Sequence, residues 1–194
     1  MSDGPNPSQL VSGPDWSLIP APENDGGADH LSGAKLPSIS LAATDGSHVD
    51  LASLRGRTIV YIYPMTGRPD VVLPDGWDEI PGARGCTPQS CAFRDHFSDL
   101  KTLGMDHLFG LSVQTTSYQQ EAVERLHLPF PLLSDNQFKL VQALGLPTFE
   151  ADGIILLKRM AWVIEDGEIR KVFYPVFPPD RNASDVINWL KAQR

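Results

Sequence analysis

Long apolar runs and blocks of positive charge are missing from this sequence. No apolar stretch approaches the roughly 20 residues of a membrane-spanning helix. The 194 residues carry a formal net charge of −8, and no cluster of Lys or Arg offsets it. An acidic surface repels polyanions, so we expect neither nucleic acid nor a membrane as a partner.

Metal-binding patterns and targeting signals are missing too. The five histidines are scattered, and the two cysteines lack the spacing of a zinc site, so we expect no metal. The first residues lack the basic region and the apolar core of a signal peptide, which predicts a cytoplasmic protein. Structural disulfides are rare in that compartment, and a close cysteine pair is more often redox-active or metal-binding.

The chain divides into a polar extension and one domain. Residues 1–35 are rich in Gly, Pro, Asp and Ser, and we expect residues 1–13 to be disordered and the rest to form an extended arm. Residues 36–194 are long enough for a single domain with a sound core.

The domain alternates predicted strands and helices. After an N-terminal hairpin (39–41 and 48–51), the strands are expected at 58–63, 107–113, 130–133, 154–164 and 169–174. The helices are expected at 87–103, 117–126 (capped by Ser117), 137–144 (capped by Asp135) and from 182 onward. Residues 65–84, rich in Pro and Gly, predict a long loop. This order predicts an α/β fold with a central mixed sheet between helices.

The only two cysteines lie in the motif Gly-Cys-Thr-Pro-Gln-Ser-Cys-Ala-Phe-Arg-Asp, residues 85–95. Cys86 is placed at the start of a helix, where a thiol most easily becomes a thiolate. On an intact helix, five residues separate the two Cα atoms by roughly 8–9 Å. A disulfide needs about 4.4–6.8 Å, so Cys86 and Cys91 can bond only if the first turn unwinds.

These residues resemble the peroxiredoxin superfamily of AhpC/TSA-like redoxins, and more narrowly its Q-type, or bacterioferritin-comigratory, branch. The resemblance runs from about Leu36 to the C-terminus. Besides the cysteine motif, it rests on Pro64 after an apolar run, on the segment 132–135, and on Arg159 before the turn at Asp166 and Gly167.

The resemblance implies a thioredoxin-like fold and an atypical two-cysteine peroxidase without metal, haem or flavin. Cys86 would attack hydrogen peroxide or an organic hydroperoxide, and Cys91 would resolve the sulfenic acid as a disulfide. Thioredoxin or a similar donor would reset it. Arg159 would stabilise the thiolate, and Pro64 would shield it from water. Relatives of this type are often monomers, and the N-terminal arm allows a weak homodimer.

Each role has a plainer alternative. Cys86 would then be a buried inert thiol, and Cys91 an inward-facing helix residue. Arg159 would be an exposed strand residue, and Pro64 a strand terminator.

The chain departs from the family pattern before the cysteine. The family places Thr or Ser three residues ahead of it, where this chain has Ala83. The segment Met65 to Gly82 reads as an insertion, and Thr66 is the candidate to supply the missing hydroxyl. Thr87 lies on the wrong side of Cys86, and Arg84 could supply charge instead.

Two other functions remain open. A thiol-disulfide oxidoreductase on the same fold would normally carry Cys-x-x-Cys, which this chain lacks. A redox sensor or thiol-switched binding protein would use the loop 65–82 as a partner site.

Overall fold

The structure is a computed structural model that describes residues 14–193. The disorder predicted for residues 1–13 lies outside the described residues. Seven strands form the central sheet in the order β2-β1-β5-β4-β3-β8-β9. They are β1 (Ser40–Ala43), β2 (His48–Asp50), β3 (Arg57–Ile62), β4 (His107–Ser112), β5 (Leu132–Ser134), β8 (Met160–Glu165) and β9 (Glu168–Phe173). The pairs β3–β4 and β4–β5 are parallel and the others antiparallel, which confirms the predicted α/β fold with a mixed sheet.

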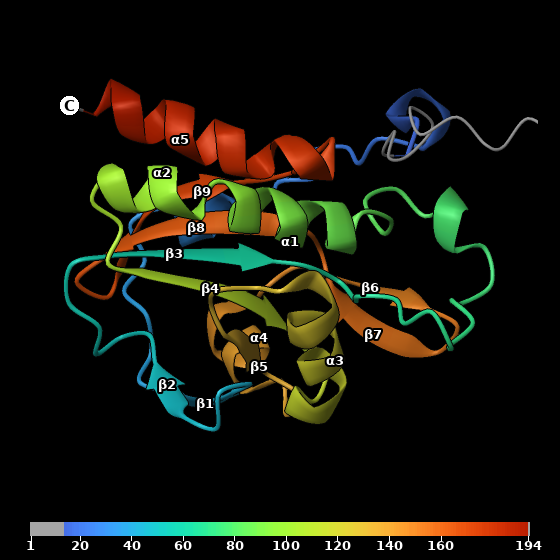
Figure 1. Cartoon of the computed structure of the whole chain (residues 1–194), viewed down its shortest axis with the longest axis horizontal. Coiled ribbons are helices and arrows are strands. Elements are labelled where there is room, and N and C mark those ends of the chain that lie inside the picture. Colours follow the sequence, from blue (N-terminus) through green and yellow to red (C-terminus); the bar gives the residue numbers. More distant parts are fainter. Residues whose placement is uncertain (1–13, 194) are drawn as a thin grey trace, which may run out of the picture.

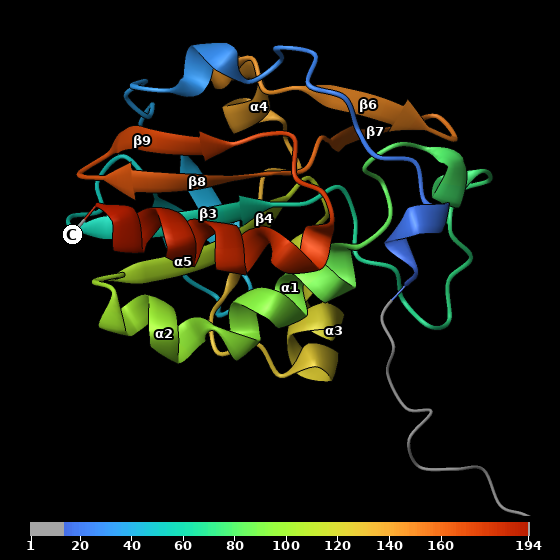
Figure 2. The same cartoon turned by 90° about the horizontal axis from the view of Figure 1, so that it is seen from above.

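Helices cover both faces of this sheet (Figures 1 and 2). One face carries α1 (Cys86–Asp95), α2 (Phe97–Thr102), α3 (Thr116–Leu126) and α5 (Asn182–Ala192). The other carries α4 (Lys139–Leu144) and the short turn η3 (Asp29–Leu31) of the N-terminal arm. Because side chains alternate along a strand, Ile59 and Tyr61 of β3 pack on the first face and Val60 and Ile62 on the second.

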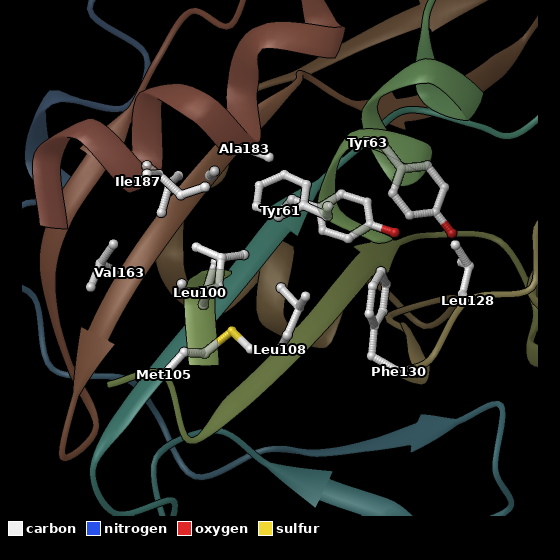
Figure 3. Packing of buried hydrophobic residues seen from close by; sticks show 14 of the residues in the cluster. Tyr61, Tyr63, Leu100, Met105, Leu108, Leu128, Phe130, Val163, Ala183 and Ile187 are labelled. Carbon is white, nitrogen blue, oxygen red and sulfur yellow. The ribbon is translucent and has the colours of Figure 1, made fainter. Parts of the chain in front are cut away.

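Tyr61 ties α1 to the centre of the sheet. Its ring stacks on Phe93 with the centroids 4.6 Å apart, and its hydroxyl donates to Ser90 Oγ at 3.0 Å. Burial raises the pKa of Tyr61 well above its ordinary value, so the phenol stays neutral and keeps its proton for this bond. Figure 3 shows Tyr61 beside Leu100 and Ile187 on this face of the sheet.

The predicted helix 87–103 is two helices, so that prediction was wrong. At His96 the backbone turns to φ −95° and ψ 9°, which ends α1 and starts α2. Phe93 before the break and Leu100 after it are both fully buried in the same core. Two short helices thus bring both side chains onto the sheet.

The predicted strand 154–164 is also two strands. The segment β7 (Ile154–Leu157) pairs with a hairpin partner that we did not predict, β6 (Thr148–Ala151), in a separate two-stranded sheet. The chain leaves that hairpin at Lys158 and Arg159 and enters the central sheet at Met160. Arg159 therefore directly precedes β8.

Two predicted helix caps had different outcomes. Thr115, not Ser117, caps α3, since its hydroxyl accepts from the Tyr118 N–H. The Asp135 carboxylate accepts from the N–H groups of Lys139 and Val141 at 2.9 Å, although α4 begins two residues later than predicted.

The arm lies against the domain from residue 14 onward. It contains η2 (Trp16–Leu18) and η3, and Leu31 is fully buried in the core on the α4 side. Lys35 forms a β-bridge with Glu168. Within residues 14–193, no helix has the length and apolar character to cross a membrane.

Candidate active site

Cys86 is the first residue of α1 and is only 4% exposed. Gly85 before it has φ 112°, a conformation that L side chains rarely adopt. A Cβ at Gly85 would lie 2.5 Å from the ring of Pro179 and 2.9 Å from the indole of Trp16. Only glycine lets the chain turn into α1 at this close contact.

Two N–H groups point at the Cys86 sulfur. The Met65 N–H donates to Sγ at 3.4 Å, and Arg159 Nη2 donates at 3.2 Å. Sγ lies 3.7 Å from the Ala83 carbonyl, to which the protonated thiol donates. Donors to sulfur stabilise the thiolate relative to the thiol, so this arrangement favours a nucleophile.

Arg159 is 3% exposed, which excludes the alternative of an exposed strand arginine. Its Nη2 also donates to the carbonyls of Gly82, Ala83 and Arg84, and its Nη1 to Gln89 Oε1 at 2.5 Å. None of the ion pairs found in residues 14–193 includes Arg159. No carboxylate neutralises the guanidinium in this part of the chain, so its charge acts on the sulfur.

Two buried amides complete this network, and sequence reasoning missed both. Gln89 and Asn182 are fully buried, and Gln89 Nε2 donates to Asn182 Oδ1 at 2.9 Å. Gln89 lies one helical turn after Cys86, on the same face of α1, which is the signal that could have found it. No local pattern marks Asn182, 93 residues farther along the chain.

The structure places the remaining candidates differently. Pro64 is buried two residues after the end of β3, and directly precedes Met65, whose N–H donates to the sulfur. Thr66 is also buried, but its hydroxyl donates to Gln114 Oε1 at 3.3 Å, and no hydrogen bond joins it to Cys86 within the described residues. The structure thus places Arg159 in contact with Cys86, places Pro64 one residue before a donor to the sulfur, and leaves Thr66 bound elsewhere.

Cys91 lies on the outer part of the same intact helix. Both cysteines are free, as expected for the reduced state of a helix that holds them roughly 8–9 Å apart. Burial raises the pKa of the Cys91 thiol, and nearby Arg94 partly opposes this. Cys91 therefore rests as a thiol, while the donors gather around Cys86.

The loop before Cys86 packs on the β6–β7 hairpin. Trp77 is 5% exposed and lies in a small core with Ala83, Ala151 and Leu156. A cavity of about 410 Å³ lies between this loop, the arm and Arg159. In residues 14–193, no group of three or more His, Cys, Asp or Glu is placed to hold a metal ion.

Comparisons with known proteins agree with this site. The Redoxin family profile matches residues 31–188. Peroxiredoxin Bcp of Escherichia coli strain K12 is 31% identical over 160 residues, covering 80% of this chain and 92% of the relative. The chloroplastic peroxiredoxin Q of Suaeda salsa is 30% identical over 164 residues, covering 82% of this chain but only about two thirds (67%) of the relative.

A solved structure shares the fold. The crystal structure of peroxidoxin BcpB from Mycobacterium tuberculosis superimposes with a TM-score of 0.68 at 23% identity, covering 84% of this chain and 98% of that one. This likeness supports the thioredoxin-like fold, and the sequence matches confirm the predicted resemblance. The chain therefore belongs to the redoxin family, in its peroxiredoxin Q/Bcp branch.

Proposed function

We propose that this chain is a thiol-dependent peroxidase that reduces hydrogen peroxide or organic hydroperoxides through Cys86. One observation supports this most strongly: a buried thiol at a helix N-terminus receives hydrogen bonds from a backbone N–H and from an arginine without a carboxylate partner among residues 14–193. Solved relatives include a bacterioferritin comigratory protein of Xanthomonas campestris whose title names alkyl peroxide reduction.

In the first step the Cys86 thiolate attacks the terminal peroxide oxygen. The S–O bond forms as the O–O bond breaks, sulfur is oxidised to sulfenic acid, and the other oxygen leaves as alkoxide or hydroxide and takes up a proton. Arg159 stabilises the thiolate and the charge that develops on the leaving oxygen. Pro64 limits access of water to the sulfur.

In the second step Cys91 attacks the sulfenic sulfur, forming the Cys86–Cys91 disulfide and releasing water. Because α1 separates the two sulfurs, its first turn must unwind before this step. A dithiol donor of the thioredoxin type then reduces the disulfide by thiol exchange. The redox-active disulfide and its donor are part of the proposal.

An apolar groove supports organic hydroperoxides as substrates. Its volume is about 560 Å³, and Met65, Phe138 and Ile154–Leu156 are among the residues that line it. Met65, whose N–H donates to the Cys86 sulfur, is one of these lining residues. We propose that the alkyl tail of an organic hydroperoxide occupies this groove, with Met65 between the tail and the site of Cys86.

The cellular location and the oligomeric state are also part of the proposal. Two free thiols that depend on a dithiol donor suit the reducing cytoplasm, although several similar plant proteins are named as chloroplastic. We further propose a monomer or weak homodimer that binds neither nucleic acid nor membranes, in keeping with the net charge of −8.

One observation keeps a redox sensor as the second candidate. A carbonyl, that of Ala83, stands near the sulfur where the family pattern has a hydroxyl, and Thr66 is bound to Gln114. A site without that hydroxyl could react once with peroxide and turn over slowly. A thiol-disulfide oxidoreductase gains no support from the structure.

A steady-state assay separates these functions. Wild type, Cys86→Ser and Cys91→Ser are compared for peroxide consumption with a thioredoxin system as the reductant. The peroxidase predicts catalytic turnover in wild type and none in Cys86→Ser, with turnover in Cys91→Ser strongly reduced. One-to-one oxidation without turnover would instead establish the sensor, and turnover in Cys86→Ser would exclude both.

A further inference from the structure

The buried amide chain behind Arg159 has a fixed direction. An arginine has only hydrogen-bond donors, so Gln89 must turn its Oε1 toward Arg159 Nη1. This leaves Gln89 Nε2 as a donor, and Asn182 Oδ1 accepts from it at 2.9 Å. The donor character of Arg159 thereby determines the orientation of both amides.

Apart from Cys86, Gln89 is the one side chain among residues 14–193 that accepts a hydrogen bond from the guanidinium. Nη1 donates to Gln89, whereas Nη2 donates to Cys86 Sγ and to three backbone carbonyls. Because the guanidinium is planar, fixing Nη1 also fixes where Nη2 points. The position of Gln89 therefore sets the approach of Arg159 to the sulfur.

We propose that Asn182 is a positioning residue: it holds Gln89, which aims Arg159 at Cys86. This inference rests on the proposed peroxidase function. Without an acceptor at position 182, the buried Nε2 of Gln89 would lose its partner. The Gln89 side chain would then swing away from Arg159 toward another acceptor.

The unused half of the Asn182 amide supports this role. Its Nδ2 is buried and has no hydrogen-bond partner within residues 14–193. A buried unpaired donor is destabilising. The bond that Asn182 does make, from Gln89 Nε2, is the one polar contact of this amide among the described residues. Asn182 thus leaves its Nδ2 donor unpaired in this part of the chain but presents its Oδ1 acceptor to Gln89.

The fold gives Asn182 a rigid base for this task. Asn182 is the first residue of α5, directly after η5 (Pro179–Arg181). Both elements pack against α1, which carries Cys86 and Gln89. Asn182 thus links the C-terminal helix to the site without touching the sulfur.

The test compares Asn182→Leu with Asn182→Asp, which keeps the acceptor. Ser184→Ala is the matched control, since Ser184 lies on the same turn of α5 and contacts His96 instead. The readouts are the single-turnover rate of Cys86 oxidation by hydrogen peroxide, the pH profile of Cys86 alkylation by iodoacetamide, and the melting temperature.

We expect Asn182→Leu to slow oxidation by about three- to tenfold, the effect of one lost hydrogen bond, and to shift the alkylation profile to higher pH. Asn182→Asp and Ser184→Ala should stay within about twofold of wild type. A purely structural residue would lower the melting temperature and leave the alkylation profile unchanged.

A second set of variants covers the case in which Asn182→Leu does not fold. In Gln89→Glu alone, the Asn182 amide can rotate so that Nδ2 donates to the new carboxylate, and the rate of Cys86 oxidation should be partly retained. In the double variant of Gln89→Glu and Asn182→Asp, two carboxylates would face each other. Its rate of Cys86 oxidation should fall well below the rates of both single variants. Additive single effects, or equal rates for Asn182→Leu and Asn182→Asp, would overturn the proposal. An inactive wild type would refute the peroxidase instead.

Discussion

Replacing Arg159 by methionine removes the cationic donor to Cys86 and keeps a side chain of similar length. The bond from Nη2 to the sulfur is 3.2 Å long and buried. A hydrogen bond to a charged group contributes about 1.5–3 kcal/mol. Since about 1.4 kcal/mol changes a rate tenfold, we expect Cys86 to react with hydrogen peroxide roughly 10- to 150-fold more slowly.

The assay is stopped-flow oxidation of Cys86 under single-turnover conditions, with circular dichroism to verify the fold. Lys158→Met is the matched control, because Lys158 adjoins Arg159 but pairs with Asp25 at 2.5 Å, away from the sulfur. It should react at the wild-type rate. The rate of Arg159→Lys should lie between the rates of wild type and Arg159→Met, because an ammonium keeps the positive charge but cannot make the planar set of contacts. A folded Arg159→Met that reacts as fast as wild type would refute the role of Arg159.

Three further predictions concern α1, the resolving thiol and the arm. Gly85→Ala should lose about 1–3 kcal/mol from backbone strain, because φ is 112° and the new Cβ would lie 2.5 Å from a proline ring of η5; an unchanged melting temperature would contradict this. Burial raises the pKa of Cys91 above its ordinary 9.0, so its alkylation should rise about tenfold per pH unit up to about pH 9, and a plateau below pH 8 would be inconsistent. The hydrogen bond from Lys158 holds the pKa of Asp25 well below its ordinary 3.8, so Asp25 stabilises the fold above that pH and loses this effect as the pH falls. The difference in melting temperature between wild type and Asp25→Asn should therefore be full at pH 6 and vanish in strong acid, and a pH-independent difference would argue against the ion pair.

Local patterns predicted most of the central sheet. The β-branched and aromatic run from Thr58 to Tyr63 gave β3, and the motif around Cys86 gave the start of α1. The strand prediction for residues 154–164 failed because tertiary packing determines which sheet this segment joins. Ile154 and Ile155 are about half exposed in a separate hairpin, so an apolar run there was read as the start of a core strand.

The site was predictable only as far as its motif residues. Cys86 and Arg159 belong to recognisable segments, and the structure places them in contact. Thr66 was predicted to supply the missing hydroxyl at the site, but its hydroxyl donates to Gln114, 48 residues away in the chain. Gln89 contacts Arg159, 70 residues away, and Asn182 contacts Gln89, 93 residues away. The helical spacing from Cys86 could have indicated Gln89, but no local pattern indicates Asn182.

The central prediction is that Cys86 reacts first and Cys91 resolves it. Mass spectrometry of wild type and Cys91→Ser, after one equivalent of hydrogen peroxide with a sulfenic-acid trap present, tests both roles together. We predict that wild type loses two hydrogens as the internal disulfide forms, and that the trap labels Cys86 in the variant. A label on Cys91 in wild type, or no rapid modification of Cys86 in either protein, would contradict this mechanism.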